Sequence, residues 1–109
     1  MIVRIWHTKV DSARIAEFEQ FAIQQSLPMF RQQAGLLGVF FTRSTDEFQT
    51  ITLWENQAAV DALATSPTYQ DTVSRIKATG FLIGDQRVDV FETWGGFMVE
   101  NLANFLAES

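Results

Sequence analysis

Three side chains carry most of the chemistry that this sequence offers: Arg4, His7 and Tyr69. His7 is the single histidine, and an imidazole exchanges protons near neutral pH, so His7 is a candidate general base. Arg4 and Tyr69 are hydrogen-bond donors that could stabilise an anion formed from a substrate. These residue types predict chemistry in which a substrate loses a proton and donors stabilise the resulting negative charge.

Each of these residues also has a structural explanation. A buried guanidinium needs an anionic partner, so Arg4 could form an ion pair with Asp89 or Glu92. His7 could be a hydrogen-bonded residue at a strand end, and Tyr69 could keep its hydroxyl in water. Arg4 and His7 are an odd number of residues apart on one predicted strand, so we expect them to point to opposite faces and not to share a pocket.

The composition argues against several other kinds of site. The 109 residues contain no cysteine and one histidine, which predicts no disulfide, no thiolate nucleophile and no metal site. The net charge of −5 predicts no binding to nucleic acid or to anionic membranes. No apolar run approaches the roughly 20 residues of a membrane span, and Arg4 and His7 interrupt any signal peptide. We therefore expect a cytoplasmic protein.

The first half of the chain predicts a strand, an interrupted helix and a hairpin. Residues 2–8 are rich in β-branched and aromatic side chains and predict a strand. A helix capped by Asp11 or Ser12 should follow, be kinked or restarted near Leu27 by Pro28, and end at Gly35. Two strands joined by a short polar turn then span residues 36–43 and 47–55.

The second half predicts two helical pieces and a last strand. Asn56 caps the first piece, in which Ala59, Ala62 and Leu63 should face inward. Ser66 and Pro67 begin the second, which places Tyr69, Val73 and Ile76 on one stripe and ends at Gly80. Gly84 and Asp85 predict a turn before a strand over residues 86–93.

The whole order is β-α-β-β-α-β, which predicts a single α+β domain over residues 1–109 with a ferredoxin-like antiparallel sheet. Its core covers residues 2–93. Residues 94–109 form a tail in which four apolar side chains at helical spacing predict a short docking helix: Phe97, Leu102, Phe105 and Leu106.

The apolar content predicts a partner for the open face of this sheet. Apolar residues make up 47% of the chain, with ten Phe and three Trp, and the first and third strands are apolar on both faces. A ferredoxin-like sheet has helices on one face only. We therefore expect a homodimer in which the helix-free faces of two sheets pack together.

Three segments carry a resemblance to a known family: Leu53-Trp54-Glu55 followed by Ala59, the run from Ser66 to Tyr69, and Pro28 with Gly35. In this order the chain resembles the antibiotic biosynthesis monooxygenase superfamily of dimeric α+β barrels, over residues 2–93. That superfamily includes cofactor-free oxygenases of aromatic polyketides, quinol oxygenases and haem-degrading enzymes.

The resemblance has consequences for individual positions. In the polyketide-oxygenase branch an Asn, a Trp and a Tyr fall at Ala59, Leu63 and Tyr69, so Tyr69 is retained. The Asn, Trp and His of haem-degrading members fall near Arg4 and at Leu63 and Val73, which implies no haem degradation. Quinol-oxygenase relatives commonly place a His at Leu63.

These observations lead to two functional hypotheses. The first is a cofactor-independent monooxygenase that oxidises a small electron-rich aromatic (a phenol, anthrone or quinol) with O₂, without metal or flavin. Tyr69, Arg4 and His7 are its candidate catalytic residues. Its aromatic pocket would be formed by Trp54, Phe30, Phe40, Phe41 and Phe81, although a tryptophan such as Trp54 is more often a core residue than part of a ligand site. The second is a non-catalytic dimeric barrel that binds a small apolar ligand or a partner.

Overall fold

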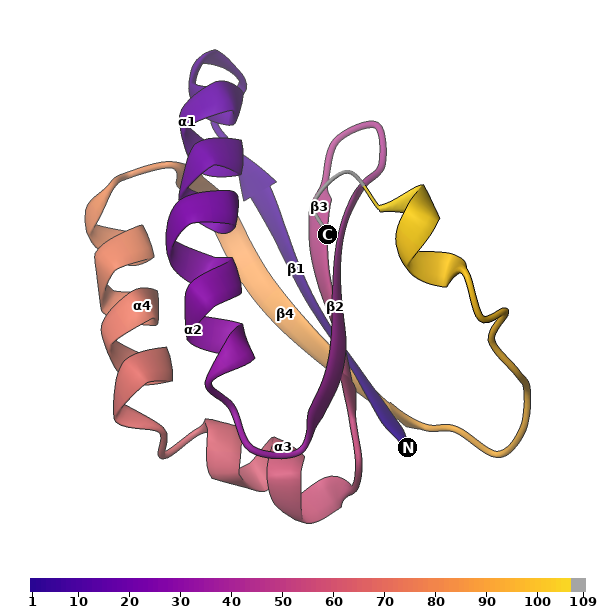
Figure 1. The fold of residues 1–109 in the computed structure, drawn as a ribbon. Helices are drawn as coiled ribbons and strands as arrows, with labels where there is room; N and C mark the ends of the chain where they lie inside the picture. The colour runs from indigo at the N-terminus through magenta and orange to yellow at the C-terminus, as the bar shows by residue number, and fades with distance from the viewer. Residues whose placement is uncertain (107–109) are drawn as a thin grey trace.

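The computed structural model describes residues 1–106. Its centre is a four-stranded antiparallel sheet with the strand order β2-β3-β1-β4. The strands are β1 (Ile2–Val10), β2 (Leu36–Arg43), β3 (Phe48–Trp54) and β4 (Leu82–Glu92). The helices lie on one face of this sheet (Figure 1). The predicted ferredoxin-like α+β fold is confirmed.

The first helical layer follows β1 and is interrupted near Pro28. A 3-10 turn, η1 (Ser12–Arg14), is capped by Asp11, whose side chain accepts from the backbone N–H of Ala13. The rest of the layer comprises α1 (Ile15–Phe21), a π-helical segment η2 (Ala22–Ser26) and α2 (Leu27–Arg31). Pro28 lacks a backbone N–H and its ring crowds the carbonyl one turn earlier, which accounts for the change of helix type just before it. The predicted restart at Leu27 is confirmed.

Two capped helices separate β3 from β4. Asn56 begins α3 (Gln57–Leu63) and Ser66 begins α4 (Pro67–Ala78), each by accepting a bond from a backbone N–H three residues later. Val60 and Leu63 are the buried residues of α3, whereas Ala62 is exposed and its predicted inward orientation is wrong. Val60 and Leu63 are three residues apart and pack together on Trp54, which turns Ala62 outward.

Gly35 lies where the first helical layer meets β2. Its φ is +81°, and a Cβ at this position would lie 2.6 Å from the Cβ of Ala59. Both the backbone conformation and the close approach of α3 therefore require glycine. The helix end predicted at Gly35 is wrong, because α2 already ends at Arg31 with Gln32 as its C-cap, and Gly35 belongs to the turn that leads into β2.

The turn predicted at Gly84 and Asp85 is wrong, because β4 begins at Leu82 and runs through both residues. The pairing shifts from His7 opposite Arg87 to Lys9 opposite Ile83, so β4 has extra residues here. Gly84 has a φ of +70°, as expected at a bulge. A left-handed glycine inside a strand produces the same sequence pattern as a turn, and pairing with β1 decides between them.

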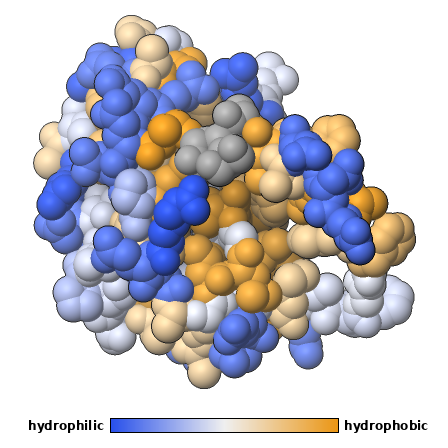
Figure 2. Space-filling view, viewed as in Figure 1, coloured by the Kyte–Doolittle hydropathy of each residue, from blue (hydrophilic) through white to orange (hydrophobic). Residues whose placement is uncertain are grey.

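The tail differs from the predicted docking helix. It contains only a four-residue 3-10 turn, η3 (Leu102–Phe105), and residues 107–109 lie outside the described part. Trp94 and Phe97 are 98% and 92% exposed. The tail lies on the side of the sheet away from the helices (Figure 1), and Figure 2 shows apolar side chains between the tail and the sheet. A short segment gains too little from helix formation unless an apolar surface covers one of its faces.

Candidate functional site

The core between the sheet and the helices is divided into two apolar clusters. One contains Ile2, Trp54, Val60 and Leu63, with Tyr69 packed against it. The other contains Val10, Phe18 and Phe81, with neighbours that include Trp6 and Ile76. Polar residues lie between the clusters in the middle of β1 and β3, where Arg4 is opposite Thr52 and Trp6 is opposite Thr50.

A cavity of about 230 Å³ lies at this break in the core, between the sheet and the helices η2, α2 and α4. Apolar side chains form most of its wall, as is usual for sites that bind small organic molecules. Its lining residues from the sheet are Arg4, Trp6, Thr50, Leu82, Gln86 and Val88, and those from the helices are Ser26, Met29, Phe30, Tyr69, Thr72, Val73, Ile76 and Lys77.

Arg4 and Tyr69 meet in this cavity. The Nη2 atom of Arg4 donates to the hydroxyl oxygen of Tyr69 at 3.1 Å, and the guanidinium carbon lies 5.8 Å from the centre of the Tyr69 ring. Because the Tyr69 oxygen accepts this bond, its own hydrogen remains available to a ligand. The remaining guanidinium N–H groups are a second source of donors.

Arg4 has no carboxylate partner within residues 1–106, so the ion pair with Asp89 or Glu92 is not formed there. Asp89 is opposite Ile5 in the register and binds His7 on the other face of the sheet. A partly buried guanidinium without a counter-ion favours the binding of an anion beside it.

Local structure places both residues. Thr52 donates from its hydroxyl to the backbone carbonyl of Arg4 at 3.3 Å, which fixes β1 against β3 at this point. Tyr69 lies in the first turn of α4, and its backbone N–H is capped by Ser66. The stripe of Tyr69, Val73 and Ile76 predicted from the helical spacing lines the cavity.

Of the aromatic residues predicted to form the pocket, Phe30 lines this cavity and the others lie elsewhere. Trp54 is fully buried in the core, where its Nε1 donates to the Thr52 hydroxyl at 2.8 Å. Phe81 belongs to the second core cluster. Phe41 borders a separate hollow beside α1 and η2, and Phe40, opposite Ile51, faces the helix-free side.

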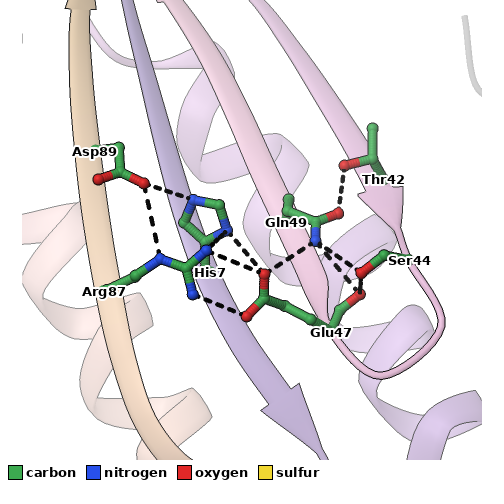
Figure 3. Close-up of polar contacts among 7 residues, drawn as sticks. All are labelled: His7, Thr42, Ser44, Glu47, Gln49, Arg87 and Asp89. Carbon is green, nitrogen blue, oxygen red and sulfur yellow. Dashed lines mark hydrogen bonds and ion pairs between the residues drawn. The ribbon is translucent and has the colours of Figure 1, made fainter.

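His7 lies on the helix-free face in a cluster of charged groups, as Figure 3 shows. Its Nδ1 is 3.1 Å from a carboxylate oxygen of Glu47, and its Nε2 is 3.0 Å from one of Asp89. Arg87 donates to the other oxygen of Glu47 at 2.9 Å. His7 and Arg4 therefore point to opposite faces, as the strand alternation predicts, and His7 does not line the cavity with Arg4 and Tyr69.

The Glu47 carboxylate should make stability depend on pH. The hydrogen bond from Arg87 is the main cause that holds the pKa of Glu47 below its usual value of 4.5; desolvation opposes it, and His7 and Gln49 make smaller contributions that also lower the pKa. Because the folded protein has the lower pKa, the stabilisation is complete above about pH 4.5 and is lost as the pH falls through the lowered pKa. Urea unfolding of Glu47→Gln should therefore vary less with pH in this acidic range. Arg87→Gln should flatten the same range, and an unchanged profile in both variants would contradict the role of this contact.

Several lining residues escaped the sequence analysis, although signals for two of them exist. Thr50 and Thr52 alternate with apolar residues on β3 in phase with Phe48 and Trp54, which marks a polar strip on a buried face. Lys77 lies eight residues after Tyr69, and this spacing returns to the same side of a helix. Which other residues line the cavity depends on how the helices pack against the sheet, and the sequence alone does not give this.

No group of three or more His, Asp or Glu side chains among residues 1–106 is arranged to hold a metal ion. In the same part of the chain, no helix has the length and apolar character needed to cross a membrane.

Comparison with known proteins places this geometry in a family. The family model described as antibiotic biosynthesis monooxygenase matches residues 1–75. No curated protein matches the sequence.

Three solved structures illustrate the shared fold. The monooxygenase ActVA-Orf6 of Streptomyces coelicolor, in complex with nanaomycin D, has a TM-score of 0.75 at 17% identity, covering 91% of this chain and 92% of its own. A variant of SnoaB, a cofactor-independent oxygenase from Streptomyces nogalater, has a TM-score of 0.70 at 16% identity, covering 87% and 94%. Rv0793 from Mycobacterium tuberculosis has a TM-score of 0.70 at 14% identity, covering 87% and 96%.

Proposed function

The chain belongs to the antibiotic biosynthesis monooxygenase family, and on this premise we propose that it is a cofactor-independent monooxygenase acting in the cavity beside Arg4 and Tyr69. Its substrate is a small electron-rich aromatic such as a phenol, anthrone or quinol, and its oxidant is O₂. The observation that carries the proposal is the Arg4–Tyr69 hydrogen bond inside an apolar cavity, with no carboxylate on the guanidinium within residues 1–106.

The proposed chemistry requires stabilisation of a substrate anion. Loss of a proton from a phenol or anthrone gives an electron-rich anion that can transfer electrons to O₂. For an anthrone, oxidation of the CH₂ group to a carbonyl consumes one O₂ and releases one water, so the substrate supplies all the electrons. Arg4 and Tyr69 donate to the oxygen on which negative charge develops, and such donors are most effective where water is excluded.

The cavity wall offers apolar surface for an aromatic ring in addition to the two donors. Met29, Phe30, Val73 and Ile76 offer apolar surface to the faces of an aromatic ring. None of the described lining residues is an Asp, Glu or His, so the site favours the deprotonated substrate chiefly through its donors. A positive charge beside the bound phenol lowers the phenol's pKa, and the proton can leave to water.

Tyr69→Phe should slow oxygen uptake by about tenfold or more, because it removes one donor aimed at the developing negative charge. The ring remains, so the free energy of unfolding should fall by only about 0.5–1.5 kcal/mol. Oxygen uptake with a panel of phenols, anthrones and quinols gives the rates, and urea unfolding gives the stability.

His7→Gln is the comparison for this experiment, because His7 lies on the opposite face. It should retain most of the wild-type turnover. An unchanged rate in Tyr69→Phe with no turnover in His7→Gln would move the site to the helix-free face. Absence of oxygen uptake by the wild type, with retention of ligand binding, would favour the non-catalytic barrel instead.

We also propose that the protein is a homodimer in which the helix-free faces pack together. Phe91 on β4 faces this side opposite Val3 and is 54% exposed, and the tail adds Trp94 and Phe97. Apolar side chains of this size are usually covered by an interface when they form a continuous surface.

Light scattering at micromolar concentration should therefore give twice the mass of the chain. Phe91→Glu should shift the mass toward the monomer, because it places a charge in the proposed interface. Ile23→Glu changes an apolar residue that is 45% exposed in the helical layer, and it should leave the mass unchanged. A monomer mass for the wild type would refute the dimer.

A further inference from the structure

The charges around the cavity differ from those of the chain as a whole. The chain has a net charge of −5, with 13 acidic residues against eight Lys and Arg. Among the described residues that line the cavity, the charged ones are Arg4 and Lys77, and no acidic residue is present. The cavity is therefore a cationic region in an acidic protein, and it attracts anions locally.

The two cations lie toward opposite ends of the cavity. Tyr69, Val73 and Lys77 follow one another at four-residue spacing on α4, so Lys77 is two turns, or about 12 Å, beyond Tyr69 along the helix axis. Arg4 bonds to Tyr69 at one end. Lys77 follows Ile76, which packs on the second core cluster.

Neither cation has a carboxylate partner within residues 1–106. The Lys77 side chain forms no hydrogen bond or ion pair there, and the Arg4 side chain hydrogen-bonds only to the Tyr69 hydroxyl. Arg75, on the same helix, shows the contrast: it binds Asp71 at 2.7 Å and Gln25 at 3.1 Å. Lys77 is exposed, so it places its charge at the cavity mouth without being desolvated.

We infer that the substrate is an acidic aromatic, with a carboxylate or similar anionic group in addition to the ring oxygen that is activated. This inference rests on the proposed function and specifies its substrate class. The reacting ring lies at the Arg4 and Tyr69 end, and the acidic group lies within reach of Lys77. Lys77 is a specificity residue, because it binds a part of the substrate that does not react.

A binding experiment with a matched pair of ligands tests this inference. The probes are anthraquinone-2-carboxylate and the neutral anthraquinone-2-carboxamide, which have nearly the same shape. Their dissociation constants are measured by fluorescence quenching, since Trp6 lines the cavity. The wild type should bind the carboxylate about fivefold more tightly, the range of an exposed ion pair, and added salt should reduce this preference.

Lys77→Met should abolish the preference and Lys77→Glu should reverse it, while the affinity for the carboxamide stays the same. Lys9→Met is the matched control, because it removes the chain's other lysine, on the opposite face of β1, with the same change in net charge. It should keep the preference. Circular dichroism checks that each variant is folded.

Equal binding of the two probes by the wild type, binding of neither, or equal effects of Lys77→Met and Lys9→Met would each overturn the inference. Failure of the proposed function has a different signature. If the carboxylate preference depends on Lys77 but no acidic or neutral aromatic is oxidised, the selectivity of the cavity remains and the monooxygenase activity is refuted. If neutral quinols are oxidised and the protein shows no preference for acids, the monooxygenase activity stands and the acidic substrate class is refuted.

Discussion

Arg4→Met should lower kcat for oxygen uptake on the order of a hundredfold, the largest change in activity that we expect from one substitution. The guanidinium donates to Tyr69 and lies in the cavity without a carboxylate partner in the described chain. Its charge interacts more strongly with the anion that forms during the reaction than with a neutral substrate. The loss should therefore fall on kcat more than on KM.

The stability of Arg4→Met separates this catalytic role from a structural one. Since Arg4 makes no ion pair within residues 1–106, methionine in its place should leave the free energy of unfolding unchanged or slightly raised. Arg4→Lys keeps the charge without the planar set of donors, and it should recover part of the rate. A variant with normal kcat and clearly lower stability would show that Arg4 serves the fold.

Trp54→Ala should reduce the free energy of unfolding by about 3–5 kcal/mol. The indole is fully buried, packs against Ile2, Val60 and Leu63, and donates to Thr52 at 2.8 Å. Truncation leaves a cavity in the core and removes the donor to the Thr52 hydroxyl, which itself donates to the Arg4 carbonyl on β1. Urea unfolding measures the effect, which is a large part of the total stability of a small domain.

The same residue tests where the substrate binds. Trp54→Phe keeps most of the apolar surface and should leave kcat and KM within about twofold of the wild type, with a loss of about 1–2 kcal/mol in stability. A strong loss of activity with unchanged stability would place Trp54 in the substrate pocket, where the aromatic content alone had put it.

Much of the fold could be predicted because the ends of several helices depend on residues close to them in sequence. Asn56 and Ser66 cap their helices within three residues of themselves, and Pro28 acts on the preceding turn. Gly84 is a position at which local sequence does not determine the boundary of a strand. A glycine with positive φ forms either a turn or a bulge, and the choice depends on pairing between β4 and β1, which are distant in sequence.

The candidate site could be predicted only in part for a similar reason. Tyr69 follows from the start of α4, and Arg4 stands out as a charge on an apolar strand. Which aromatic residues line a cavity depends on how helices and sheet pack, and the same alternation suits Trp54 in the core and Phe30 in the wall. The docking helix predicted for the tail is absent because helical spacing alone does not stabilise a short helix, and the one helical turn there, Leu102–Phe105, buries none of its residues.

The central claim is that Arg4 and Tyr69 act as one unit on the substrate anion, and a double-mutant cycle tests it most directly. Oxygen uptake is measured at saturating anthrone or quinol for the wild type, Arg4→Met, Tyr69→Phe and the double variant. Because Arg4 donates to the Tyr69 hydroxyl and so makes it a better donor, the losses should not multiply. The double variant should be within about threefold of Arg4→Met alone. Losses that multiply fully, or single variants as fast as the wild type, would contradict the account.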